Sequence, residues 1–309
     1  MLVLEALVPV VLVIGVGSLL RRFEILSEEI ERGMMAMVVQ VLLPALILAN
    51  IIGNKALGDW AEVGKVAGFG CGGLLIGLTL AYLCAGLLGM KRGDGKRTFG
   101  VTAGIQNYGF IGVPLLLSLF PGDGLLGVLL THNVGVEIAM WTMGVSLMRG
   151  DKSFSWKLFM KAPILAVVFG LVINALGWDG LFQGVPMKAF EMLGAAAIPI
   201  ALVVIGAGLV ELLKREQFDW KIAIGSIVVR LALIPACLIG AAYLLPISLE
   251  LKKVVVIQAA MPAAMFPIIL AKHYGGKPEV AVQVVVATTV ACFLTMPFVI
   301  VIGMKVLGL

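Results

Sequence analysis

The chain has 309 residues, of which 61% are hydrophobic and only 13% are charged. Soluble domains carry about 25% charged residues, so this composition excludes an ordinary water-soluble domain and indicates a chain surrounded mostly by lipid. The net charge of +5 does not indicate a nucleic-acid-binding surface, because the lysines and arginines lie in short connectors. The four cysteines lack the spacing of a metal site or a disulfide framework.

Apolar runs of about 20 residues predict membrane-spanning helices. We expect the first run to be a membrane helix and not a cleaved signal peptide, because no basic residue precedes it and Arg21 and Arg22 follow it. We expect an all-α polytopic membrane protein with ten spans. Their approximate ranges are 2–20, 33–52, 62–89, 98–120, 124–148, 158–177, 189–213, 221–245, 251–272 and 278–307.

The lysines and arginines are distributed unequally over the connectors. Sixteen of the 23 lie in or beside every second connector, six lie on the opposite side, and Arg230 lies inside a span. Cytoplasmic loops carry the excess of positive charge. Both termini are therefore predicted to lie outside the cytoplasm, in a multi-pass protein of the cell membrane.

Three short similarities recur at nearly equal offsets of 154, 155 and 152 residues. They favour a duplication of five helices, with repeats at 1–150 and 151–309, over chance similarity among Leu/Val/Pro-rich helices. Since five is odd, the second repeat would be inserted upside down, as in many secondary transporters. The matched pairs are Pro9 with Pro163, Pro44 with Pro199, and 105–117 with 257–270.

The fourth and ninth spans carry residues that disfavour an unbroken helix. Gly109, Gly112 and Pro114 lie in the middle of the fourth span, and Pro262 and Pro267 lie in the ninth. Lipid satisfies no free backbone group, so non-helical backbone at this depth must be buried in protein or line an aqueous cavity. Two broken helices meeting near the midplane would present helix amino ends, which attract anions.

Four stretches resemble the auxin efflux carrier family of membrane permeases. The more specific ones are "NYGFIGVP" (107–114) and "QAAMPAAMFPIILAKHYGG" (258–276), and the weaker ones are "LLPALIL" (42–48) and "AIPIALVVIGAGL" (197–209). The family includes plant auxin exporters and bacterial permeases described as malonate or malate carriers. The chain looks like a bacterial-type member, because it lacks the long cytoplasmic loop of many plant members.

The resemblance implies more than the residues alone. It implies a homodimer in which helices 1, 2, 6 and 7 form a scaffold and helices 3–5 and 8–10 form a mobile transport unit. Helices 4 and 9 would cross at their prolines, cradle an organic anion and carry it by an elevator-type movement. Asn107 matches the family asparagine expected to touch the carboxylate, and Pro114 and a proline of 262 or 267 match the crossover.

Two sets of residues are therefore candidates for function. Glu137, in the fifth span, is interpreted as a proton carrier, a sodium ligand or the ion-pair partner of Arg230, and Arg230 could alternatively neutralise a substrate carboxylate. The coupling set is completed by His132. The substrate-binding set comprises Gln106, Asn107, Tyr108, Pro114, Gln258, Met261, Pro262 and Pro267.

The sequence thus predicts a secondary active or facilitative transporter of a small organic anion, such as malonate, malate or an auxin-like acid. No ATP-binding GxxxxGK[ST] motif and no HExxH or GxSxG motif occurs, so neither an ATP-driven pump nor an enzyme is indicated. No cofactor or metal is expected; proton or sodium coupling is possible. The alternative is a sodium-coupled organic-anion symporter of the bile-acid type.

Overall fold

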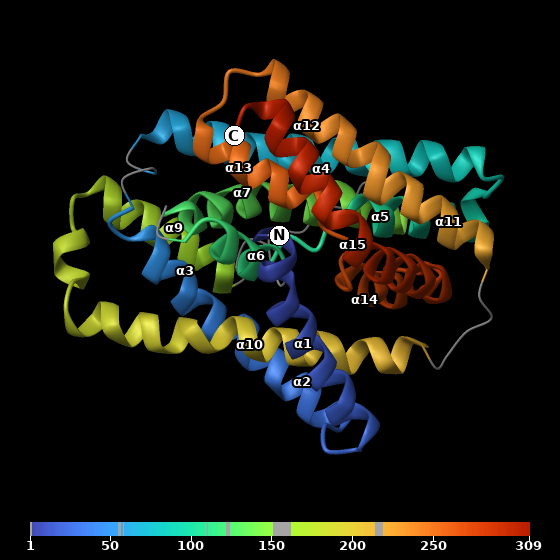
Figure 1. The fold of residues 1–309 in the computed structure, drawn as a ribbon, viewed down its shortest axis with the longest axis horizontal. Helices are drawn as coiled ribbons and strands as arrows, with labels where there is room; N and C mark the ends of the chain where they lie inside the picture. Colours follow the sequence, from blue (N-terminus) through green and yellow to red (C-terminus); the bar gives the residue numbers. More distant parts are fainter. Residues whose placement is uncertain are drawn as a thin grey trace. The chain divides into compact units, whose positions relative to one another are not determined.

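In a computed structural model of the chain, residues 2–54, 57, 59–109, 111–121, 124–150, 162–213 and 219–309 are described. These residues form helices joined by short connectors (Figure 1). Within these ranges there is no β-strand, only an isolated two-residue bridge that belongs to the candidate site. The all-helical class expected from the apolar runs is confirmed.

Six helices in the described ranges are long and apolar enough to cross a membrane. A helix rises 1.5 Å per residue, so about 20 residues span the hydrocarbon core. The other expected spans hold α1 (Leu2–Arg22), the shorter α9 (Ala162–Ala175) or pairs of half-length helices, and ten spans in an inverted repeat stay a prediction. The six are Glu28–Ile51, Trp60–Leu87, Leu125–Arg149, Val185–Gly208, Trp220–Leu244 and Pro278–Leu307.

Three of the six contain a π-helical turn, in which the wider backbone locally changes the hydrogen-bond pattern. Pro44 and Pro235 are the second residues of the α-helical parts that follow two of these turns. The three composite helices are α2 (Glu28–Met37), η1 (Val38–Leu42) and α3 (Leu43–Ile51); α7 (Leu125–Ala139), η4 (Met140–Gly144) and α8 (Val145–Arg149); and α11 (Trp220–Val228), η7 (Val229–Leu233) and α12 (Ile234–Leu244).

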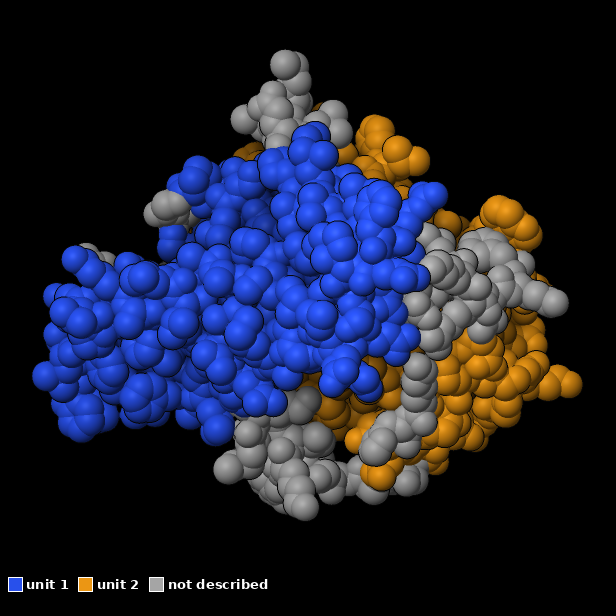
Figure 2. All heavy atoms as spheres, turned by 90° about the horizontal axis from the view of Figure 1, so that it is seen from below, with its two compact units in different colours: residues 1–67, 113–134, 156–211 blue, residues 68–112, 135–155, 212–309 orange. Residues whose placement is uncertain are grey.

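The chain divides into two compact units (Figure 2). Unit 1 comprises residues 1–67, 113–134 and 156–211, and unit 2 comprises residues 68–112, 135–155 and 212–309. Each unit draws residues from both halves of the chain. The remaining helices are α4 (Trp60–Leu87), η3 (Arg92–Lys96), α5 (Arg97–Gly104), α6 (Gly112–Leu119), η6 (Asp179–Phe182), α10 (Val185–Leu213), α13 (Leu249–Ala259), α14 (Phe266–His273) and α15 (Pro278–Leu307).

In unit 1, polar side chains tie helix ends and helix pairs together. The Ser18 hydroxyl of α1 donates a hydrogen bond of 2.9 Å to the Gly206 carbonyl of α10. Asn174 of α9 donates to the Ile51 carbonyl at the end of α3 (2.7 Å) and accepts from the Gly53 amide (2.7 Å). The side chain of Asn174 thereby satisfies backbone groups that the end of a helix leaves unpaired.

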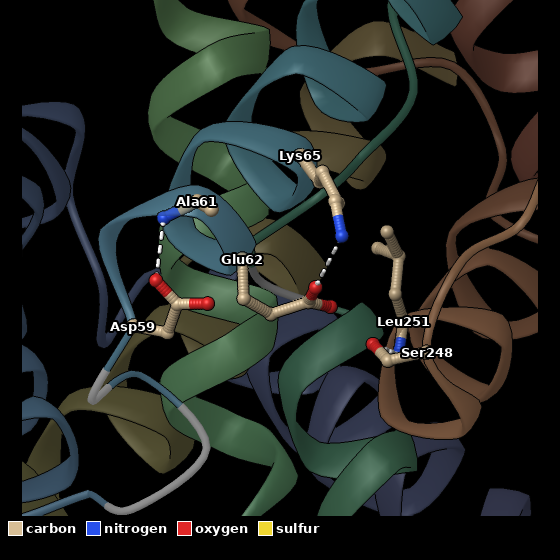
Figure 3. A network of polar contacts seen from close by, with 6 residues as sticks. All are labelled: Asp59, Ala61, Glu62, Lys65, Ser248 and Leu251. Carbon is tan, nitrogen blue, oxygen red and sulfur yellow. Dashed lines mark hydrogen bonds and ion pairs between the residues drawn. The ribbon is translucent and has the colours of Figure 1, made fainter.

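The first turn of α4 also belongs to unit 1 and starts with a side-chain cap (Figure 3). The Asp59 carboxylate accepts a hydrogen bond of 2.9 Å from the Ala61 amide. One turn later, Lys65 and Glu62 form an ion pair with an Nζ–Oε2 distance of 3.5 Å. The acceptor before the first turn satisfies an orphan amide and stabilises the helix start.

In unit 2, α15 packs against α5, α11, α13 and α14. The first half of α15 is buried on all sides, over residues 280–289, which is why its valines and alanines show no amphipathic pattern. The neighbouring α13 begins with Ser248, whose hydroxyl accepts from the Leu251 amide at 3.4 Å (Figure 3).

Small residues let α4 and α5 of unit 2 approach closely. A Cβ atom on Gly104 would lie 2.8 Å from the Leu78 Cα, and one on Gly77 would lie 2.6 Å from the Gly104 carbonyl oxygen. No described atom lies within 4 Å of a Cβ built on Gly68 or Gly72. The close contact with α5 therefore lies one to three turns further along α4 than these two glycines.

The fourth span is interrupted at its glycine- and proline-rich stretch, as expected, but Pro114 itself follows the interruption. Pro9, Pro199 and Pro297 lie inside continuous helices, so proline alone does not interrupt a helix here. Pro114 lies in the first turn of α6, after the interruption, and Pro267 is in the first turn of α14. An amide in a first turn has no intrahelical partner, so proline is favourable there.

Candidate binding site at two helix interruptions

Two helices, α5 and α13 of unit 2, stop and are followed by a new helix, as the sequence predicted for the fourth and ninth spans. α5 ends at Gly104, where Ile105 turns to an extended conformation (φ −91°, ψ 116°), and α6 begins at Gly112. α13 ends at Ala259 and α14 begins at Phe266. Both non-helical segments are largely buried in protein, which is the condition for non-helical backbone at membrane depth.

The two interruptions pair with each other through their backbones. The Asn107 amide donates to the Pro262 carbonyl at 2.8 Å, and the Ala264 amide donates to the Ile105 carbonyl at 2.9 Å. Between them, Gln106 and Ala263 form an antiparallel bridge. Groups that would each cost several kcal/mol if left unsatisfied in hydrocarbon are thus satisfied by the partner segment.

Side chains fasten this pair of segments to neighbouring helices. The Gln258 amide group of α13 donates to the Tyr108 carbonyl at 3.0 Å. A Cβ on Gly112 would lie 3.1 Å from the Gln258 Nε2 atom, so the start of α6 passes directly beside this amide. Thr288 of α15 accepts from the Ala263 amide at 3.2 Å. The Oε1 atom of Gln258 is buried and has no partner among the described residues.

Glu137 contacts the first interruption through Tyr108. The Tyr108 hydroxyl donates to the Glu137 carboxylate, whose other oxygen accepts from the Trp141 indole at 2.6 Å. The Trp141 ring meets the Phe266 ring edge-on, with centroids 5.1 Å apart. A chain of contacts thus runs from Tyr108 in the first interruption to Phe266, the first residue of α14.

Arg230 pairs with a backbone carbonyl rather than with Glu137, which was one alternative from the sequence analysis. Its guanidinium lies on η7, is fully buried and donates to the Gly104 carbonyl at 3.4 Å. Its Nε and Nη2 atoms have no partner among the described residues. The ion pair between Arg230 and Glu137, one of the alternatives from the sequence, is not formed within the described ranges, since Glu137 is held by Tyr108 and Trp141.

The other predicted residues divide between the two units. Gln106, Met261, Pro262 and Pro267 are buried in unit 2 with the paired segments. Pro114 belongs to unit 1.

His132 also belongs to unit 1. It is 3% exposed, and its Nδ1 atom lies 3.4 Å from the Asn133 Oδ1 atom.

Three side chains of the site were not among the predicted site residues, those of Trp141, Thr288 and Phe266. Thr288 is followed by a second threonine in the middle of a predominantly apolar tenth span. A polar pair in a buried membrane helix needs a partner, so this pattern was the available signal. Phe266 carries no comparable signal, because phenylalanine is ordinary in an apolar run.

A helix–break–helix element at two places, in an apolar chain of this length, invites comparison with known transporters. A family model described as "Membrane transport protein" matches residues 2–153 and 151–300. The chain belongs to this family, that of the auxin efflux carriers. The resemblance inferred from the residues of the two interruptions is confirmed.

Relatives in this auxin efflux carrier family are distant but nearly collinear with the chain. An uncharacterized transporter of Methanothermobacter thermautotrophicus is 24% identical over 95% of the chain and 96% of its own length. An uncharacterized transporter of Methanocaldococcus jannaschii is 24% identical over 89% of the chain and 90% of its own length. An auxin efflux carrier component of Arabidopsis thaliana is 25% identical over 38% of the chain and 32% of its own length. Membership in the family makes the chain a membrane transport protein.

Proposed function

We propose that the protein is a secondary active or facilitative transporter of a small organic anion, such as malonate, malate or an auxin-like acid. The substrate binds at the paired interruptions of unit 2. The observation that carries this proposal is the mutual pairing of Asn107 with Pro262 and of Ala264 with Ile105, at 2.8 and 2.9 Å, in the middle of two predicted spans. Such discontinuous helices form the substrate sites of many secondary transporters.

The electrostatics of the paired segments support an anionic substrate. In unit 2, α14 begins at this place, and the amino end of a helix attracts negative charge. The buried guanidinium of Arg230 adds a full positive charge at the last carbonyl of α5. The donors assigned to the carboxylate are the side chain of Asn107 and the amide group of Gln258.

A larger framework is proposed on the family resemblance. It comprises ten spans in two inverted repeats, a scaffold of helices 1, 2, 6 and 7, a homodimer, and an elevator-type movement in the cell membrane with both termini outside the cytoplasm. Support comes from the recurrence of the helix–break–helix element at an offset of about 150 residues. Partial support is that α1, α2, α3, α9 and most of α10 fall in unit 1, while most of α4 and all of α5, α8, α11, α12, α13, α14 and α15 fall in unit 2. The remaining parts of the proposed mobile unit, α6 from Val113 on and most of α7, fall in unit 1 instead.

The sodium-coupled alternative is disfavoured by Arg230. In transporters with broken helices, sodium binds at the carboxyl ends of half-helices and at unwound carbonyls. Here a guanidinium already contacts the Gly104 carbonyl at the carboxyl end of α5. We therefore propose transport that persists when sodium is replaced by potassium. Uptake that stops on this replacement would restore the alternative.

The test is a thermal-shift screen of malonate, malate and indole-3-acetate on the purified protein, followed by uptake into proteoliposomes of the acid that stabilises it. Asn107→Ala is expected to weaken binding of that acid by about tenfold or more, since a hydrogen bond to a charged group contributes about 1.5–3 kcal/mol. Gln183→Ala, at an exposed position of unit 1, is the matched control and is expected to bind normally.

Two outcomes would count against the proposal. If Asn107→Ala binds the acid as tightly as the control, Asn107 is not part of the site. If none of the carboxylates stabilises the protein and none is taken up by proteoliposomes, an organic anion is the wrong substrate class.

A further inference from the structure

A cavity of about 510 Å³ opens in unit 2, and none of its lining residues belongs to the paired interruptions. Its apolar wall is formed by one side of α4 and by the segment η4–α8. Leu75, Leu78 and Leu83 contribute from α4, and Met143 and Leu147 face them. Leu83 and Met143 remain 58% and 56% exposed, so the wall continues onto the outer surface of the unit. In a membrane, such a surface is covered by acyl chains.

The cavity also has a basic lining, made by Arg92 and Arg97 together with Tyr82 and Ser146. Arg92 donates through Nε to the Tyr82 hydroxyl at 3.2 Å, and Arg97 donates through Nη1 to the Arg149 carbonyl at 2.9 Å. Each guanidinium has five N–H donors. Since one is used in each of these bonds, both side chains are oriented while most of their donors are left for a ligand.

The positive charge at this end is not cancelled by the nearby acidic residue. Residues 91–97 hold four basic residues and one acidic residue, Asp94. Asp94 is engaged by Lys277, with an Oδ1–Nζ distance of 2.6 Å, and this hydrogen bond lowers the pKa of the Asp94 carboxyl. In the part of the chain that the structure describes, neither Arg92 nor Arg97 has a carboxylate partner, and Lys96 adds its charge 4.5 Å from the Tyr82 ring centre.

We propose that this cavity binds an anionic phospholipid, with the phosphate on Arg92 and Arg97 and an acyl chain along the leucines of α4. The positive charge of the two arginines favours a negatively charged headgroup. The apolar wall, which continues onto the outer surface, favours a lipid over a free phosphate. Basic pockets between membrane helices on the cytoplasmic side bind such headgroups. The connector 88–97 is one of those that the charge distribution assigns to the cytoplasm.

The test compares two lipids with identical acyl chains, phosphatidylglycerol and phosphatidylcholine, added to the full-length protein in detergent. Binding is followed by thermal shift and by native mass spectrometry of the retained lipid. Phosphatidylglycerol is expected to bind more tightly. Arg92→Gln is expected to weaken it about fivefold, since one basic residue near an anionic lipid contributes about 1 kcal/mol. The matched control is Arg22→Gln, at an exposed arginine of unit 1 that ends α1 next to another connector of predicted cytoplasmic location.

Arg92→Gln is chosen over a change at Arg97, because Arg97 also holds the carboxyl end of α8. Equal binding of the two lipids, or equal loss in Arg92→Gln and Arg22→Gln, would overturn the proposal. Glycerol phosphate, which has no acyl chain, is the third probe. If it protects the protein as well as phosphatidylglycerol does, the cavity binds a free anion and the assignment to a lipid is wrong.

Discussion

Single ionisable residues inside membrane spans attract attention in a sequence, but their partners depend on other helices. Glu137 and Arg230 were the two charges deepest in predicted spans, which suggested an ion pair. In the structure, Glu137 accepts from Tyr108 and Trp141, whereas Arg230 donates to the Gly104 carbonyl. Both charges therefore attach to the same interruption at different points. Glu137 holds the side chain of Tyr108, and Arg230 holds the end of α5.

The contact between Tyr108 and Glu137 predicts a measurable coupling. In a double-mutant cycle of Tyr108→Phe and Glu137→Gln, we expect a coupling free energy of about 0.5–3 kcal/mol, the range for residues in direct contact. The free energies of unfolding would be measured by titration with sodium dodecyl sulfate. As a control, Tyr243→Phe removes the hydroxyl of a tyrosine that is 64% exposed. Combined with Glu137→Gln, it is expected to be additive within about 0.5 kcal/mol. Additivity in both cycles would show that the Tyr108–Glu137 contact is energetically irrelevant.

At the scale of elements, the interruptions are maintained by pairing and not by proline. Continuous helices run through Pro9, Pro199 and Pro297, while the break before α6 precedes Pro114. A helix tolerates one missing amide by bending, but a five-residue or longer gap needs another partner for its backbone groups. Each interruption supplies that partner for the other.

The close approach of α4 and α5 predicts a position-specific effect of adding one methyl group. Gly104→Ala is expected to destabilise the protein by about 1–3 kcal/mol or to prevent its folding, because a Cβ there would lie 2.8 Å from the Leu78 Cα. The control is Gly72→Ala, on α4, the helix that Gly104 of α5 contacts. No described atom lies within 4 Å of its Cβ, so the change is expected to be neutral or to stabilise by up to about 1 kcal/mol. The measurement is thermal unfolding in detergent, and equal melting temperatures of the two variants would contradict the close contact.

At the scale of the whole molecule, the distribution of charge and the odd number of helices in a repeat determine the proposed topology. Sixteen basic residues lie on one side and six on the other. If the second repeat is inverted, both termini share the side with fewer basic residues. The fold of the two units by itself does not depend on this orientation, because helix packing is the same for either insertion.

Labelling of single cysteines tests this topology. In a variant without the four native cysteines, Gly180→Cys is expected to react with a membrane-impermeant maleimide in intact cells. Gly93→Cys is expected to react only after permeabilisation. Both positions are exposed, so access to the reagent depends on the side of the membrane. Alkaline phosphatase fused to either terminus is expected to be active. Labelling of both cysteines from the same side would contradict the assignment.

The sequence by itself determined the helical membrane class of the protein, the places of the two interruptions and the family, and six of its ten predicted spans are long apolar helices in the structure. These features are local, because lipid requires about 20 consecutive apolar residues and penalises glycine- and proline-rich stretches wherever they occur. Only the tertiary structure decided which groups meet: Asn107 with Pro262, Tyr108 with Glu137, Arg230 with Gly104. The helical period tells which residues share one face of a helix, but it contains no information on which face of another helix lies opposite. The missed role of Thr288 and the ion pair that did not form have this same physical reason.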